Sequence, residues 1–230
     1  MSDDPKLKQA TGEVGAYLLA QYRDERKRLR AADAASALGG LAGIFAQIQA
    51  RAMMQSGAIK QTETTLAEVT TQTGERYYFG DAINAVLLDG AREAPSFWNL
   101  AGGAARDAKI GDKIDVLEIA KRATRDVGSP KFGQPLVVGR YKLSETPLQA
   151  VRAHGPWFLA RFLEMGLEPP KLMWVFGSVA QSFAPFAAGE VKDLQPDVSV
   201  MRVDLVRIYM EAAVPMSKMD LRTVGMAIEP

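Results

Sequence analysis

The chain has 230 residues, with 28 basic and 27 acidic side chains, one histidine and no cysteine. Without cysteine there can be no disulfide, thiolate nucleophile or cysteine-ligated metal, and a single histidine excludes metal sites that need two imidazoles from one chain. The formal charge of +1 gives no reason to expect nucleic acid binding. We therefore expect neither a metal nor another cofactor.

The length suits one domain covering residues 1–230, and the Pro- and Gly-rich loop 129–141 is a candidate subdomain boundary. Residues 1–5 lack the basic and apolar regions of a secretory signal peptide. Together with the absence of cysteine, this favours a cytoplasmic protein.

The first predicted helix covers residues 6–30. Val14, Leu18 and Tyr22 recur at a spacing of four, which places them on one helical face. The end of this segment, residues 23–30, is strongly charged, which is typical of a solvated helix face with internal ion pairs.

A second predicted helix contains 17 residues without a formal charge, 34–50. Within it, Ala31, Ala35, Gly39 and Gly43 are spaced four apart, so they line one stripe that lets another backbone approach closely. Such a stripe suits a tightly packed internal helix or the seam of a dimer. The run reaches only the short end of a membrane-spanning length, and its glutamines disfavour membrane association.

The segment 68–79 changes character, because it combines β-branched and aromatic residues around Thr73 and Gly74. This pattern predicts a short β-hairpin. A lone hairpin is marginally stable in water, so we expect it to pack against the helices.

In the rest of the chain, N-cap residues indicate where helices begin. Asp81, Ser96 and Thr146 each precede a segment suited to a helix and are good N-cap residues. Asp115 and Glu118 have the spacing of a capping box.

Proline positions set the expected limits of two later helices. Gly155 and Pro156 predict a break, because proline cannot donate to the helical hydrogen-bond ladder. Residues 198–212 follow helical spacing, and Pro215 should end that helix. We predict a mainly α, compact multi-helix bundle of about seven helices with one short β-hairpin near residues 68–79.

The junction between the hairpin and the following helix is a candidate ligand site. Tyr78, Asp81 and Asn84 lie together in the sequence, and Trp98 begins a glycine-containing helix. Aromatic and polar side chains between helices are typical of small-molecule pockets. The structural alternative is that Asp81 only caps its helix, and the sequence leaves this choice open.

Four further residues have side chains that could take part in catalysis or binding: His154, Glu211, Ser217 and Lys218. His154 is a candidate general base, or a helix-terminal histidine stabilised by the helix dipole. Ser217 and Lys218 suggest Ser–Lys catalysis, but neighbouring helix residues point about 100° apart. The sequence leaves open whether Glu211 is functional or structural.

Three segments resemble a family of bacterial cytoplasmic helical proteins for which no activity is established. They are residues 78–84, 97–103 and 211–218. The resemblance implies a compact helical fold and a bacterial cytoplasmic setting. It transfers no catalytic or binding residue.

We hypothesise a non-enzymatic interaction protein that forms a homodimer, because catalytic signals are few and the small-residue stripe and Met-rich C-terminus suit an interface. The first alternative is a small-ligand-binding protein or enzyme with an interhelical pocket near Tyr78, Asp81, Asn84 and Trp98. The second is peripheral membrane association through residues 34–50. The predicted interface consists of small and methionine side chains: Ala31, Ala35, Gly39, Gly43, Met216 and Met219.

Overall fold

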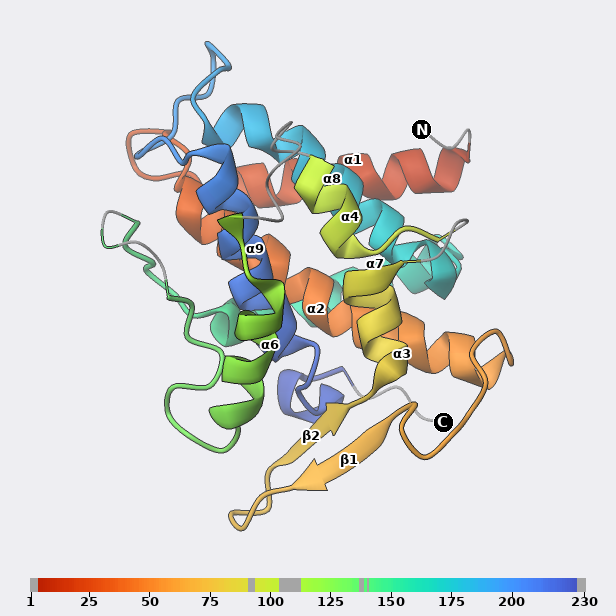
Figure 1. The fold of residues 1–230 in the computed structure, drawn as a ribbon. Helices are drawn as coiled ribbons and strands as arrows, with labels where there is room; N and C mark the ends of the chain where they lie inside the picture. Colours follow the sequence, from red (N-terminus) through yellow and green to blue (C-terminus); the bar gives the residue numbers. More distant parts are fainter. Residues whose placement is uncertain (1–3, 91–93, 104–112, 137–138, 140, 227–230) are drawn as a thin grey trace.

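The computed structural model describes residues 4–90, 94–103, 113–136, 139 and 141–226 (Figure 1). Within these residues the fold is mainly α-helical with one two-stranded antiparallel sheet, as predicted. The α-helices are α1 (Pro5–Gln21), α2 (Ala31–Gln55), α3 (Asp81–Asn84), α4 (Phe97–Gly103), α6 (Val116–Arg125), α7 (Pro147–Glu164), α8 (Leu172–Ala187) and α9 (Arg202–Met216). The strands are β1 (Ala67–Thr70) and β2 (Arg76–Phe79), and three shorter helices are η1 (Ala85–Asp89), η2 (Pro169–Lys171) and η3 (Leu221–Val224).

Helix α2 crosses the middle of the molecule, and α7, α8 and α9 pack against it (Figure 1). Every residue from 34 to 50 is buried, which explains why this run carries no charge. Among the described residues, α2 is the one helix whose length and apolarity would suit a membrane span, and the window concerned is wholly buried inside the protein.

Two glycines bring α2 and α9 into backbone contact. A Cβ added to Gly39 would lie 2.8 Å from the Cα of Tyr209, and one added to Gly43 would lie 2.9 Å from the Cα of Ala213. Only glycine fits at these points. The small-residue stripe therefore packs within the chain, and all four of its members are buried: Ala31, Ala35, Gly39 and Gly43.

Two glutamines in the buried run fix neighbouring backbone segments. The Gln47 side-chain nitrogen donates to the carbonyls of Ser217 and Met219, at 2.9 and 3.1 Å. The Gln49 oxygen accepts from the backbone N–H of Met173 at 3.0 Å, near the start of α8, where no N-cap side chain is present. These hydrogen bonds hold the segment after α9 and the start of α8, while the buried Gln47 side-chain oxygen has no hydrogen-bond partner among the described residues.

The hairpin predicted near residues 68–79 is confirmed. Its register places Glu68 opposite Tyr78, and Gly74 has a positive φ of 85° in the turn. The backbone N–H of Tyr78 donates to the carbonyl of Lys218 at 2.8 Å, which ties β2 to the segment after α9.

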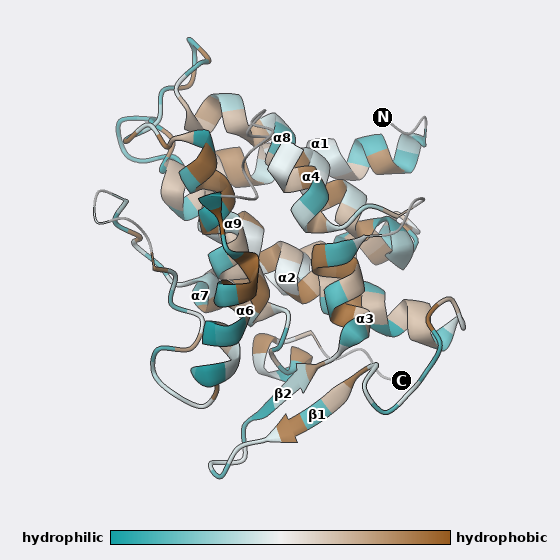
Figure 2. Cartoon of the chain, viewed as in Figure 1, coloured by the Kyte–Doolittle hydropathy of each residue, from teal (hydrophilic) through white to brown (hydrophobic). Residues whose placement is uncertain are grey.

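Helix α6 is amphipathic, with polar and apolar residues on different faces (Figure 2). Its buried residues are Ile119 and Ala123, and it packs on α9. Arg122 on the same helix forms an ion pair with the buried Glu211 of α9. Glu211 therefore has a structural role as the partner of a nearby cation.

The predicted helix over residues 6–30 is wrong beyond Gln21. Asp24 accepts hydrogen bonds from the backbone and side chain of Arg28, which closes a turn. Leu29 then pairs through its backbone with Gln195 and Asp197 and is fully buried. A distant segment of the chain therefore determines this conformation.

The predicted break at Gly155 and Pro156 is also wrong, because α7 continues through both residues to Glu164. The helix buries Val151 before the proline and Phe158 after it. Packing on both sides of Pro156 offsets the lost hydrogen bond. Capping by Ser96, Asp115 and Thr146 is confirmed by their hydrogen bonds to backbone N–H groups.

Candidate ligand-binding pocket

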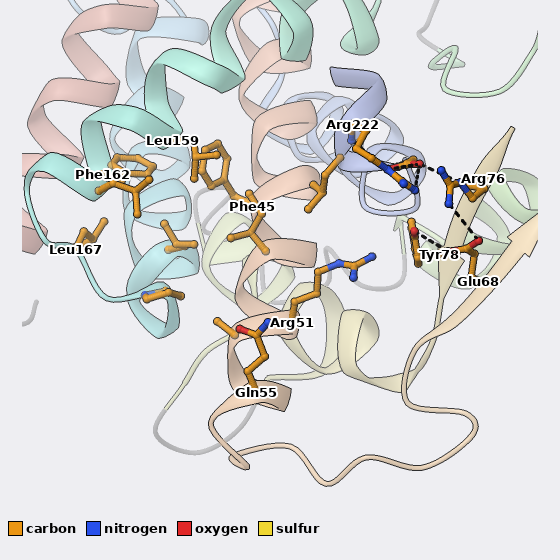
Figure 3. A pocket seen from close by; sticks show the side chains of 17 residues that line it. Phe45, Arg51, Gln55, Glu68, Arg76, Tyr78, Leu159, Phe162, Leu167 and Arg222 are labelled. Atoms are coloured by element: carbon orange, nitrogen blue, oxygen red, sulfur yellow. Dashed lines mark hydrogen bonds and ion pairs between the residues drawn. The ribbon is translucent and has the colours of Figure 1, made fainter. Parts of the chain in front are cut away.

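A pocket of about 740 Å³ opens where the C-terminal end of α2 emerges from the core. Its walls come from α2, α7, the hairpin, and the segments around η2 and η3 (Figure 3). Pockets of this size hold drug-sized molecules.

One end of the pocket is apolar. Phe45 of α2 and Phe162 of α7 stack edge to face, with ring centroids 5.4 Å apart. Leu163 lies at the opening and is 70% exposed. The remaining apolar lining residues complete this wall: Ile48, Leu159, Leu167, Pro169, Leu172 and Leu221.

The other end is a chain of paired charges that runs from the hairpin to η3 (Figure 3). Tyr78 donates to the Glu68 carboxylate at 2.8 Å, and Arg76 lies 3.8 Å from the same carboxylate. Arg76 also approaches Asp220 at 3.5 Å, and Arg222 forms hydrogen bonds of 2.7 and 2.9 Å to Asp220. Two carboxylates thus compensate two of the guanidinium groups.

Arg51 lies between the two ends and differs from the other two arginines. Its guanidinium carbon stands 4.3 Å from the centroid of the Tyr78 ring, in a cation–π contact. Within the described residues no carboxylate pairs with it, and its buried Nε has no hydrogen-bond acceptor. A buried donor without a partner carries an unfavourable desolvation free energy.

Two ionisable groups of the pocket, Asp220 and Tyr78, have shifted pKa values. Burial works against ionisation of Asp220, but hydrogen bonds from Arg222 outweigh it and lower the pKa of the carboxyl group. Burial raises the pKa of Tyr78, and the hydrogen bond to Glu68 adds to that shift. At neutral pH, Asp220 is therefore ionised and Tyr78 is protonated.

Of the predicted ligand residues, Tyr78 lines this pocket, whereas Asp81, Asn84 and Trp98 do not. The N-cap of α3 is Gly80, and the side chain of Asp81 instead accepts from the Thr64 hydroxyl at 3.1 Å. The capping role predicted for Asp81 is wrong for that reason. The residues that accompany Tyr78 come from other parts of the chain.

Sequence reasoning missed Arg51 and the charged residues around Tyr78. Two signals could have found some of them. Arg51 is the first charge after the buried run, and Glu68 and Tyr78 are matched across the predicted hairpin. That these residues line one pocket with Asp220 depends on tertiary packing and has no sequence signal.

The methionines of the predicted interface, Met216 and Met219, are buried in the core. Because the stripe residues are also covered, any homodimer would have to use other residues than the six predicted. Ser217 donates its hydroxyl to the Val214 carbonyl at 2.8 Å, so it is held by its own helix. Lys218 is 7% exposed and its ammonium group faces the Phe79 ring at 4.6 Å.

His154 belongs to a separate polar cluster. It lies within α7, away from the helix end, and its two ring nitrogens are 3.0 and 3.3 Å from the hydroxyls of Tyr17 and Tyr22. Tyr22 also donates to the Glu145 carboxylate. Burial lowers the pKa of His154, and the Glu145 carboxylate opposes that shift. This cluster joins α1 to α7, and its residues do not line the pocket.

No family model, curated protein or solved structure matches this chain.

Proposed function

We propose that the protein binds a small molecule with a substantial apolar portion in the pocket at the end of α2. The observation that carries this proposal is a 740 Å³ cavity whose apolar wall meets a small group of fixed charges. Ligand-binding pockets are mainly apolar, with a few placed polar groups that orient the ligand.

Binding fits the pocket chemistry better than catalysis. A general acid or base works best when its pKa lies near the working pH. Asp220 has a lowered pKa and Tyr78 a raised one, so both are shifted away from neutrality. Arg76 and Arg222 are held by carboxylates, which suits a rigid binding wall.

The test is to fill the pocket by one substitution. Ala52 lines the pocket from α2 and is half-buried, so Ala52→Trp places an indole in the cavity without opening the core. We expect wild-type protein to bind the neutral dye Nile red with a blue-shifted emission, and the variant to bind it at least tenfold more weakly.

The matched control is Ala153→Trp, on the exposed surface of α7 and outside the pocket lining. It should bind the dye as the wild type does, and circular dichroism should show the same helical content for all three proteins. Equal dye binding by Ala52→Trp and the wild type would refute the proposal.

A further inference from the structure

We infer that the ligand is a single-chain amphiphile with one negative charge, whose carboxylate lies on Arg51 and whose chain lies along the apolar wall of Phe45 and Phe162. This inference rests on the proposed function and adds the chemical class of the ligand.

Arg51 is held in place without an anionic partner among the described residues. Its guanidinium is held over the Tyr78 ring, so its position is fixed before any ligand arrives. An arginine stacked in this way keeps its in-plane N–H donors for a planar anion such as a carboxylate. Within the described residues no side chain takes that place, and the pocket is the space beside it.

The charges of the lining also favour an anionic ligand. Among the described lining residues, Arg51, Arg76 and Arg222 are accompanied by two carboxylates, those of Glu68 and Asp220. Arg76 and Arg222 are both engaged with these carboxylates. Within this described lining, one positive charge is left uncompensated, at Arg51. A ligand with a single negative charge completes the balance, whereas a dianion would leave an excess charge in a partly buried site.

The apolar and the charged residues of the pocket are separated in space. The apolar side chains of Phe162, Leu159 and Leu167 gather on one side of Arg51, and the charged residues gather on the other (Figure 3). A molecule with its anionic group at Arg51 therefore directs its apolar chain away from the paired charges and along the leucine and phenylalanine side chains.

The experiment compares three ligands with the same chain. Decanoate, decanol and decyl phosphate are titrated against Nile red bound to the full-length protein at pH 7.5. We expect decanoate to displace the dye at a concentration about tenfold lower than decanol, because it adds a charge-assisted hydrogen bond. Decyl phosphate should bind no more tightly than decanoate.

Variants locate the head group. In Arg51→Met the preference for decanoate over decanol should disappear while decanol binding is retained, and Arg51→Lys should restore part of the preference. Arg125→Met, on the exposed surface of α6, controls for the loss of one positive charge and should keep the tenfold preference.

Two outcomes would overturn the inference while leaving the pocket proposal intact. One is equal binding of decanoate and decanol in wild type and Arg51→Met. The other is decyl phosphate binding more tightly than decanoate, which would point to a phosphate-bearing ligand. Failure of the dye and of all three ligands to bind the wild type would overturn the proposed function as well.

Discussion

Two regions of α2, one around Gly39 and Gly43 and the other from Phe45 to Gln55, are packed in opposite ways. Around Gly39 and Gly43 the helix is covered by the backbone of α9, and no space remains. From Phe45 to Gln55 the apolar face turns toward a cavity of about 740 Å³. The same helix is therefore closed around Gly39 and Gly43 and open toward the pocket from Phe45 to Gln55.

The difference between these two regions depends on which elements face α2 at each of them. Glycine at the crossing lets two backbones meet, so the contact excludes every side chain. At the open end, α7 and the hairpin are held apart, and larger side chains line the gap between them (Figure 3). Small residues thus stabilise the fold at one end, while large residues shape a site at the other.

The largest effect on stability is expected from adding one methyl group where α2 crosses α9. In Gly43→Ala the new Cβ overlaps the backbone of Ala213, which cannot move like a side chain. We expect a loss of about 3 kcal/mol in the free energy of unfolding, measured by urea denaturation. Gly15→Ala in α1 is the matched control, because a Cβ there meets no atom within 4 Å.

The control should change stability in the opposite direction. Alanine is favoured over glycine inside a helix, so Gly15→Ala should gain about 0.5–1 kcal/mol. Equal and small effects for the two substitutions would contradict the tight crossing of α2 and α9.

An intermediate effect on stability is expected at Lys218, which lies in the sequence between Ala213 of the crossing and Asp220 of the pocket. Burial lowers the pKa of its amine from 10.5 to about 8. Between these values the unfolded chain holds the proton and the folded protein releases it, so this group makes the folded state more stable as pH rises. This pKa shift corresponds to a destabilisation of the folded state by roughly 3 kcal/mol at neutral pH. The cation–π contact with Phe79 offsets about 1 kcal/mol of it.

Lys218→Met should therefore be more stable than the wild type at pH 7, by about 2 kcal/mol, and this advantage should shrink toward pH 10. Urea unfolding at pH 7, 8.5 and 9.5 measures it. Lys121→Met, on the exposed surface of α6, controls for the loss of one positive charge. An advantage that does not vary with pH would show that the amine is not desolvated.

The smallest change in stability is expected where α2 lines the pocket. Ala52→Leu adds three carbons to the same helix that cannot accept a single carbon at Gly43. At position 52 the longer side chain enters the cavity. We expect stability to change by no more than about 0.5 kcal/mol. Thermal and urea unfolding would check this, and a loss comparable with that of Gly43→Ala would mean that the pocket is filled by the protein itself.

The homodimer predicted from the sequence stays a prediction. The six residues expected to form its interface are covered by the protein's own helices. A native mass measurement would decide the oligomeric state.

Much of the local structure could be predicted because short-range chemistry controls it. Ser96, Asp115 and Thr146 cap helices through side-chain hydrogen bonds to residues three positions on. The hairpin follows from its β-branched and aromatic strands and from Gly74 in the turn. Each of these features depends on neighbours within a few residues.

Predictions failed where distant segments decide the conformation. Residues 23–30 have helical propensity. Leu29 instead forms backbone hydrogen bonds with Gln195 and Asp197, and the chain before it forms a turn. Pro156 disfavours a helix locally, yet packing of Val151 and Phe158 keeps α7 continuous. In both places burial outweighs local preference.

The sequence by itself determined that the 34–50 stretch carries no formal charge and that its small residues form one helical stripe, because charge and spacing are local properties. Only the tertiary structure decided what covers that stripe. It also brought Arg51, Tyr78 and Asp220 into the lining of one pocket, together with apolar residues of α7. The physical reason is that a pocket is a relation between surfaces from distant parts of the chain, and their packing alone fixes which of them meet.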